Sequence, residues 1–418
     1  MAALRTMAKH LRNLLEVRLY RPSHFRIGLQ DYFDLRTPAR ALQSTSIHLT
    51  GASDWICRAQ DANADGGVAA RYRFSHGWTA SYPETTGYII PTFFNYATFK
   101  HDNTYRQRAL RMADWLLSVQ QNNGAFPGHD VSKKSAPRVF NTGQALAGLV
   151  RAFRETGNDS YLQASIRAGD WLVSVQDANG AWTKFAYYER AHTYYTEVDW
   201  PLLELFTATQ TPAYYEAAVK HLEWTLSHQQ PNGWIDKCGF RDDVAPFLHT
   251  IAYAMQGWLE SGAILQPEAP AKNIYVQAAL RSAEALLHRY EIRGFMAGQF
   301  DRNWKGTVTY SCLTGNAQTA INWLRLYELT HDARFLNGAL KLNDYIKSTQ
   351  DLKSNNPGVR GGIKGSHPLW GRYISYSYPN WAAKFFMDAL MLEDKLLREL
   401  ERPESRYEHR HSLQKLEP

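Results

Sequence analysis

Apolar and polar positions divide most of the chain into helical segments of two alternating kinds. Segments of the first kind, such as 143–157 (GQALAGLVRAFRETG), carry apolar or small residues nearly all round, which is typical of a buried helix. Segments of the second kind, such as 158–176 (NDSYLQASIRAGDWLVSVQ), are polar along one face, which is typical of a helix between core and solvent. Only a short turn separates the two, so each pair predicts an antiparallel helical hairpin.

This hairpin recurs along the chain. Five complete copies are predicted at 86–120, 143–176, 198–229, 249–290 and 314–350. A sixth buried helix, 380–397, has no partner after it, and an outer-type helix within 44–69 has no partner before it. Pairing these two closes a ring, so we predict an all-α fold, an (α/α)6 barrel whose sixth hairpin is formed by the N- and C-terminal helices.

A repeated phrase supports this periodicity. The outer helices end in SVQQNNGAF (Ser118–Phe126), SVQDANGAW (Ser174–Trp182) and SHQQPNGW (Ser227–Trp234). Their glutamines, Gln120, Gln176 and Gln229, are separated by 56 and 53 residues. A fixed spacing of this size indicates stacked units that share one core.

The remaining residues lie at the two ends of the barrel sequence. We predict an N-terminal basic extension at 1–43, the barrel at 44–397 and a polar C-terminal tail at 398–418. The first 20 residues favour a basic amphipathic helix that packs on the barrel wall, and this extension is the only part for which membrane contact is considered.

The net charge of +7 is spread along the chain, with no run of five basic residues. This argues against nucleic-acid binding and leaves an acidic glycan as the expected partner. The three cysteines form no CxxC pair and the histidines are scattered, so we expect no cofactor and no metal site. The start is too polar for a secretion signal, which makes the cytoplasm the expected location.

The loops indicate where the site lies. Turns from inner to outer helices are tight, whereas the connections back run to about 20 residues and are rich in Gly, Pro, Tyr and His, as at 124–141 and 353–379. These long loops all precede inner helices, so the site is expected at the N-terminal ends of that ring. Six helix N-termini pointing at one opening would stabilise a negatively charged ligand.

The residues that open the inner helices supply candidate chemistry. Glycoside hydrolysis requires two carboxyl groups, whereas uronate elimination or epimerisation requires a base such as Tyr or His. The candidate catalytic residues are Glu84, Asp199, Asp243, His249 and His192. For Asp199, which precedes Pro201, helix capping is an equally good explanation. The candidate substrate-binding residues are Tyr82, Asn141, Gln144, Glu189, Tyr194, Trp200, Arg241, Tyr253, Gln318, Trp370, Asn380, Trp381 and Lys384.

The repeat order and the segments YPETTGY (82–88), FNTGQAL (140–146), HTIAYAMQG (249–257), LTGNAQ (313–318) and PNWAAKFFMDAL (379–390) resemble the six-hairpin glycosidase-like superfamily. The resemblance covers about residues 44–397 and extends to proteins encoded among bacterial surface-polysaccharide genes. It implies a toroid-shaped glycoside hydrolase or polysaccharide lyase. The QxxxGxW phrase also resembles that of triterpene cyclases, in which the glutamine braces a neighbouring helix, but the cyclases' DxDD motif is absent.

These observations predict a carbohydrate-active enzyme that hydrolyses glycosidic bonds in an anionic bacterial polysaccharide or oligosaccharide through carboxyl groups. Two alternatives remain open at this stage. One is a uronate lyase or C5-epimerase with a Tyr or His base, and the other is a non-catalytic glycan-binding protein of polysaccharide assembly.

Overall fold

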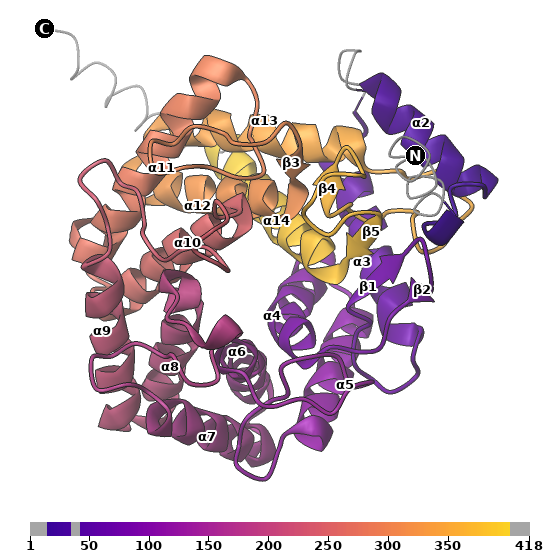
Figure 1. The fold of residues 1–418 in the computed structure, drawn as a ribbon. Coiled ribbons are helices and arrows are strands. Elements are labelled where there is room, and N and C mark those ends of the chain that lie inside the picture. The colour runs from indigo at the N-terminus through magenta and orange to yellow at the C-terminus, as the bar shows by residue number, and fades with distance from the viewer. Residues whose placement is uncertain (1–14, 35–41, 402–418) are drawn as a thin grey trace, which may run out of the picture.

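Two concentric rings of helices make up the body of the protein (Figure 1), of which this computed structural model describes residues 15–34 and 42–401. The inner ring consists of α4 (Pro83–Lys100), α6 (Val139–Thr156), α8 (Thr196–Thr209), α10 (Leu248–Leu265), α12 (Leu313–Thr330) and α14 (Asn380–Glu401). The outer ring consists of α3 (Thr45–Asp61), α5 (Asn103–Val119), α7 (Asp159–Ser174), α9 (Pro212–Leu226), α11 (Ile274–Arg293) and α13 (Ala333–Thr349).

Each inner helix packs against its two neighbours, and α14 closes the ring against α4. The outer helix α3 packs on α14, so the two ends of the barrel sequence form the sixth hairpin. Thr45 at the start of α3 donates a hydrogen bond of 3.1 Å to Glu393 on α14. The predicted (α/α)6 barrel is therefore confirmed.

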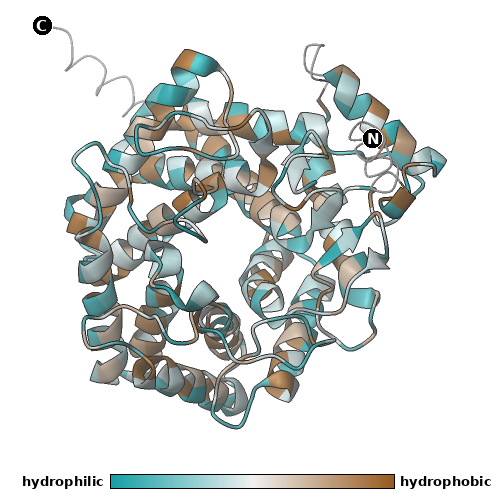
Figure 2. Cartoon of the chain, in the orientation of Figure 1, coloured by the Kyte–Doolittle hydropathy of each residue, from teal (hydrophilic) through white to brown (hydrophobic). Residues whose placement is uncertain are grey.

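The polarity of each ring follows from the sequence pattern. On α5 the buried residues Ala109, Met112, Ala113 and Leu116 are spaced as one face of a helix, and that face meets the inner ring. Figure 2 shows both brown and teal segments on outer helices such as α5 and α7. The inner helices α4 and α6 approach each other closely, because a Cβ on Gly87 or on Gly148 would lie 2.4 Å from a backbone oxygen of the facing helix.

The repeated glutamine phrase braces the outer ring. The Gln120 amide donates to the carbonyl oxygen of Gly124 in its own loop at 2.9 Å and to that of Ala164 on the next outer helix at 2.8 Å. The same pair of bonds is made by Gln176, Gln60 and Gln350, and Gln229 reaches Ala278 and Ser282. Gly124 has φ +90°, and a Cβ there would lie 2.2 Å from a carbonyl oxygen of α7, which explains the glycine in the phrase.

Short strands fix the long loops at the N-terminal ends of the inner helices. β1 (Arg71–Arg73) pairs antiparallel with β2 (Gly77–Trp78) and with β5 (Ser377–Pro379). β3 (Ser311–Cys312) pairs with β4 (Ser366–His367). The loop before α14 is thereby held beside the loop before α4.

The N-terminal segment contributes α2 (Pro22–Asp34), which lies outside the barrel beside β1 and β2 (Figure 1). Asp31 on α2 forms a buried ion pair of 2.5 Å with Lys364 in the loop before β4. Most of the helix predicted for the first 20 residues lies outside the described residues, as does the C-terminal tail from 402 on. Along the described part of the chain, no helix combines the length and the apolar character needed to cross a membrane.

Candidate active site

A cavity of about 410 Å³ opens at the N-terminal ends of the inner helices. We call it the upper cavity. Its walls come from α4, α6, α10 and α14, from the segment before α8 and from the loops at 128–138 and 373–374. The predicted site residues that line it are Tyr82, Glu84, Asn141, Tyr194, His249, Tyr253 and Trp381. These residues are far apart in the sequence, and the ring brings them to one hollow.

Glu84 is the half-buried carboxyl group of this cavity. The Tyr82 hydroxyl donates a hydrogen bond of 2.5 Å to Glu84 Oε2. The Asn141 amide in turn donates to the Tyr82 hydroxyl at 3.1 Å and to the carbonyl oxygen of Pro127 at 3.0 Å. Burial raises the pKa of Glu84 from 4.5 to about 7, although the bond from Tyr82 lowers it. A protonated Glu84 can therefore serve as a proton donor near neutral pH.

His249 on α10 provides a neutral imidazole on another wall. Its Nδ1 lies 2.6 Å from Gln318 Oε1, and because an amide oxygen only accepts, Nδ1 carries the proton. Burial lowers the pKa of His249 from 6.5 to about 4, although the bond with Gln318 raises it. Nε2 is then the unprotonated nitrogen and the one available to a ligand. The neighbouring Tyr253 hydroxyl is buried and has no hydrogen-bond partner.

The rim of the upper cavity is cationic. Arg71 on β1, Lys133 and Arg138 line it, together with the single rim carboxylate of Asp130. The Arg71 Nε is buried without a partner, and burial lowers the pKa of this guanidinium, which nevertheless stays charged. An anionic group in the cavity would supply the missing acceptor.

Sequence reasoning missed several lining residues. They are Arg71, Asp130, Lys133, Arg138, Tyr187 and Tyr373. Arg138 is the last residue of a long loop and directly precedes the inner helix α6, a position that the sequence pattern could have indicated. Arg71 reaches the cavity only because β1 pairs with β5, which no local pattern indicates.

Three predicted catalytic residues lie elsewhere. Asp199 is fully buried between α8 and α9, where its Oδ2 lies 2.7 Å from His221 Nδ1. Asp243 is exposed and pairs with Arg241 on the surface. His192 is buried with its ring nitrogens 3.0 Å and 2.7 Å from backbone carbonyl oxygens. None of these three residues lines the upper cavity, and the contacts of the buried Asp199 and His192 serve the packing of the fold.

The other predicted substrate-binding residues are dispersed. Glu189 and Trp370 are exposed and do not line the upper cavity. Asn380 is buried, and its amide donates to the carbonyl oxygen of Ala69 and to the hydroxyl group of Thr85. Gln318 stands behind His249. Gln144, Trp200 and Lys384 line a second cavity of about 330 Å³, further along the barrel axis toward the C-terminal ends of the inner helices. We call it the lower cavity.

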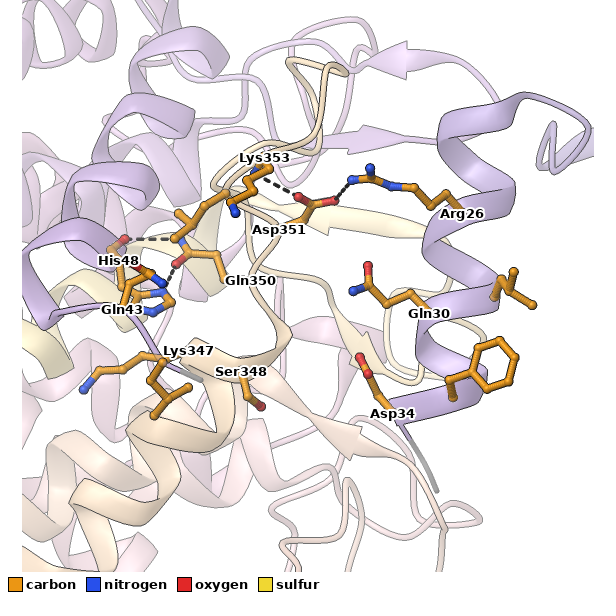
Figure 3. A pocket seen from close by; sticks show the side chains of 14 residues that line it. Arg26, Gln30, Asp34, Gln43, His48, Lys347, Ser348, Gln350, Asp351 and Lys353 are labelled. Atoms are coloured by element: carbon orange, nitrogen blue, oxygen red, sulfur yellow. Dashed lines mark hydrogen bonds and ion pairs between the residues drawn. The ribbon is translucent and has the colours of Figure 1, made fainter. Parts of the chain in front are cut away.

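A larger hollow of about 620 Å³ lies outside the ring, between α2 and the C-terminal end of α13 (Figure 3). Two pairs of its polar side chains are bonded to each other: Arg26 to Asp351 at 3.1 Å and His48 to Gln350 at 2.6 Å. No predicted site residue lines it. We therefore place the candidate active site in the upper cavity. Residues 15–34 and 42–401 contain no group of three His, Cys, Asp or Glu side chains that could hold a metal ion.

The chain is similar to proteins that act on carbohydrates. The catalytic domain of the β-L-arabinofuranosidase family GH127 matches residues 59–250. A search among curated proteins finds no match. Many solved structures share the fold, and three of them illustrate the likeness. An unsaturated glucuronyl hydrolase specific for heparin has 15% identity and a TM-score of 0.66, with coverage of 84% of this chain and 97% of that one.

The unsaturated glucuronyl hydrolase of Bacillus sp. GL1 has 14% identity and a TM-score of 0.65, covering 87% and 98% of the two chains. The cellobiose 2-epimerase of Spirochaeta thermophila has 15% identity and a TM-score of 0.64, covering 82% and 94%. These likenesses show that the chain shares the (α/α)6 barrel fold of these proteins, as the sequence predicts. Together with the match to a glycosidase catalytic domain, they support the prediction of a carbohydrate-active enzyme of the glycoside hydrolase type.

Proposed function

We propose that this protein hydrolyses a glycosidic bond in an anionic polysaccharide or oligosaccharide, and that Glu84 is the general acid. The observation that carries the proposal is one half-buried carboxyl group, with its pKa raised to about 7 by desolvation, in a cavity walled by aromatic side chains. Glu84 would protonate the leaving oxygen of the scissile bond. Tyr82, fixed by Asn141, holds the carboxyl group in place.

Hydrolysis requires a second carboxylate. Asp130 is the candidate, because it lines the same cavity from the loop before α6 and is partly exposed. It accepts a hydrogen bond of 3.3 Å from the backbone N–H of Ser132. The upper cavity thus places Asp130, which water reaches and which would act as the base or nucleophile, together with Glu84, whose pKa is raised by burial as a general acid requires. The two environments therefore assign two different roles.

The charge of the rim supports an anionic substrate. Arg71 has an unpartnered buried nitrogen, and Lys133 and Arg138 stand beside it. A uronate or another acidic sugar would place its carboxylate on the Arg71 guanidinium. The two glucuronyl hydrolases of the same fold are compatible with such a substrate. Three free cysteines suit a reducing compartment, and we propose that the enzyme acts in the cytoplasm.

The test is product analysis with purified protein and a set of acidic oligosaccharides. New reducing ends without the ultraviolet absorbance of an unsaturated uronate would support hydrolysis. Glu84→Gln and Asp130→Asn should each lower kcat at least about 100-fold, whereas Asp243→Asn on the outer surface should leave kcat unchanged. Equal activity of wild type and Glu84→Gln would refute the assignment of Glu84.

One observation favours a second candidate, proton abstraction from a sugar carbon. His249 is neutral, and its Nδ1–H is held by Gln318, so Nε2 has the lone pair that a base requires. The cellobiose 2-epimerase shares the fold. Incorporation of solvent deuterium into the recovered sugar, or growth of the unsaturated-uronate absorbance, would favour an epimerase or a lyase over the hydrolase. Both signals should then be lost in His249→Asn.

A further inference from the structure

The lower cavity carries chemistry that the proposed hydrolysis does not use. It is lined by parts of five inner helices, α4, α6, α8, α10 and α14, and by Ile321 of the sixth. Its floor is buried, and its rim, which includes Asn95 and Lys395, is exposed. Tyr88 lines both the lower and the upper cavity and so separates them. Glu84 and the other members of the catalytic proposal do not line it.

Two side-chain oxygens on the floor have no partner. They are Glu197 Oε1 and Gln256 Oε1, on side chains of residues that are 3% and 6% exposed. Buried polar atoms are nearly always hydrogen-bonded, so two unpartnered oxygens beside one hollow indicate that a bound molecule supplies hydrogen-bond partners there. Gln144, across the floor, already uses its amide N–H on the carbonyl oxygen of Glu197 at 3.0 Å.

The walls alternate flat apolar surfaces with fixed charges. Trp200 stands near the rim, and Phe385 and Tyr88 lie deeper. Lys384 sits 3.9 Å from the centre of the Phe385 ring and forms an ion pair of 2.9 Å with Asp388, so its charge is already balanced. A hollow of about 330 Å³ is at the small end of ligand pockets. Flat rings beside unpartnered polar oxygens suit a molecule with C–H faces and several hydroxyl groups, which can donate and accept.

We propose that the lower cavity is a second binding site, for one sugar unit whose hydroxyl groups form hydrogen bonds with Glu197 and Gln256 and whose apolar face contacts Trp200. The site is separate from the catalytic one and does not depend on the reaction that occurs in the upper cavity. It explains why Gln144, Trp200 and Lys384, polar or aromatic residues near the start of inner helices, gather at a place that the catalytic residues do not reach.

A methionine near the site allows a local measurement. Met391 lines the lower cavity, and of the described methionines it alone lines either barrel cavity. The full-length protein is labelled with [methyl-¹³C]methionine, and the Met391 signal is assigned with Met391→Leu. D-Glucose and D-glucosamine are then titrated separately. The proposal expects that at least one of them shifts the Met391 signal saturably and leaves the other methionine signals in place.

Variants test the contacts. Gln256→Leu removes an acceptor and Trp200→Ala removes a wall near the rim, and each should weaken the titration by roughly three- to tenfold, the equivalent of one lost hydrogen bond or stacking contact. Trp370→Ala, an exposed tryptophan that lines neither barrel cavity, and Glu84→Gln should leave the titration unchanged.

The measured dissociation constants are compared only among variants that unfold cooperatively on heating and are therefore folded. If Gln256→Leu does not fold, Trp200→Ala decides. A Met391 signal that neither sugar moves in the folded wild-type protein would overturn the proposal, because the cavity would then hold only water. It would also be overturned if the titration were unchanged in Trp200→Ala or were abolished by Glu84→Gln. None of these outcomes depends on whether the protein hydrolyses a glycan.

Discussion

Replacing Glu84 with glutamine should stabilise the protein at alkaline pH while it removes the proposed acid. Glutamine keeps the shape of the side chain and an oxygen that accepts the Tyr82 hydroxyl bond of 2.5 Å. In the wild type, burial raises the pKa of Glu84 from 4.5 to about 7. Each unit of pKa shift is worth 1.36 kcal/mol, so this rise lowers the free energy of unfolding by about 3 kcal/mol once Glu84 is ionised.

The sign follows from proton binding. Below pH 4.5, Glu84 is protonated in both the folded and the unfolded chain, and its ionisation has no effect on stability. Between pH 4.5 and about 7 the unfolded chain releases the proton first, so the free energy of unfolding of the wild type falls as the pH rises. Above pH 7 the full loss of about 3 kcal/mol is present, and Glu84→Gln does not suffer it.

Urea denaturation of wild type and Glu84→Gln at pH 4 and at pH 8 measures the difference. The two proteins should have similar free energies of unfolding at pH 4, and the variant should be more stable by about 3 kcal/mol at pH 8. The other buried carboxyl groups are common to both proteins and cancel in the comparison. An equal difference at both pH values, or a variant less stable at pH 8, would refute the assignment of a Glu84 that is protonated at neutral pH in the folded protein.

Three further predictions follow from the same contacts. If Glu84 is the acid, kcat should fall as the pH rises through about 7, and a pH–rate profile that is flat from pH 5 to 9 would exclude it. Asp199→Ala, which leaves His221 unpaired, should lower the free energy of unfolding by about 3–5 kcal/mol in urea, against less than about 1 kcal/mol for the exposed Asp243→Ala. Gln120→Leu removes two bonds of the brace and should lower the free energy of unfolding by about 1–3 kcal/mol in the same assay. Gln121→Leu is the control, because that side chain makes a single bond of 3.5 Å. Equal losses of stability in the two variants would contradict the bracing role.

The fold could be predicted because its information is local and repeated. The alternation of buried and half-polar helices, the short turns and the spacing of Gln120, Gln176 and Gln229 all point to one architecture. One helix at each end of the barrel sequence had no partner, so the ring had to be closed by pairing these two helices, and α3 does pack on α14. The glutamine brace also follows from the repeat, and its amide groups reach carbonyl oxygens in the second turn of the next outer helix.

The candidate site could be predicted only in part. Glu84, Asn141 and His249 reach the upper cavity because they occupy the first turn of an inner helix, and that position is readable from the sequence. Asp199 occupies the equivalent position but points outward to His221, because a one-residue step along a helix turns a side chain by about 100°. The position of Asp199 in the sequence correctly placed it at the N-terminal end of α8. The face of α8 on which it lies is determined by the packing of α8 on α9.

The sequence also did not indicate how far along the barrel axis each side chain lies. Gln144 lies three residues after Asn141, and Lys384 three after Trp381, yet these pairs are divided between the lower and the upper cavity. Each turn of helix advances about 5.4 Å, which is enough to pass the level of Tyr88. Arg71 and Asp130 come from loops whose course depends on β1 pairing with β5 and on the turn at 127–137, contacts that a helical pattern does not contain.

The most direct test of the whole account is a crystal structure of Glu84→Gln with a bound acidic oligosaccharide. The account predicts that the sugar occupies the upper cavity, with a glycosidic oxygen within hydrogen-bond distance of the side chain at position 84 and a sugar carboxylate on Arg71. An oligosaccharide bound outside the upper cavity, or inside it with no glycosidic oxygen near position 84, would contradict the account.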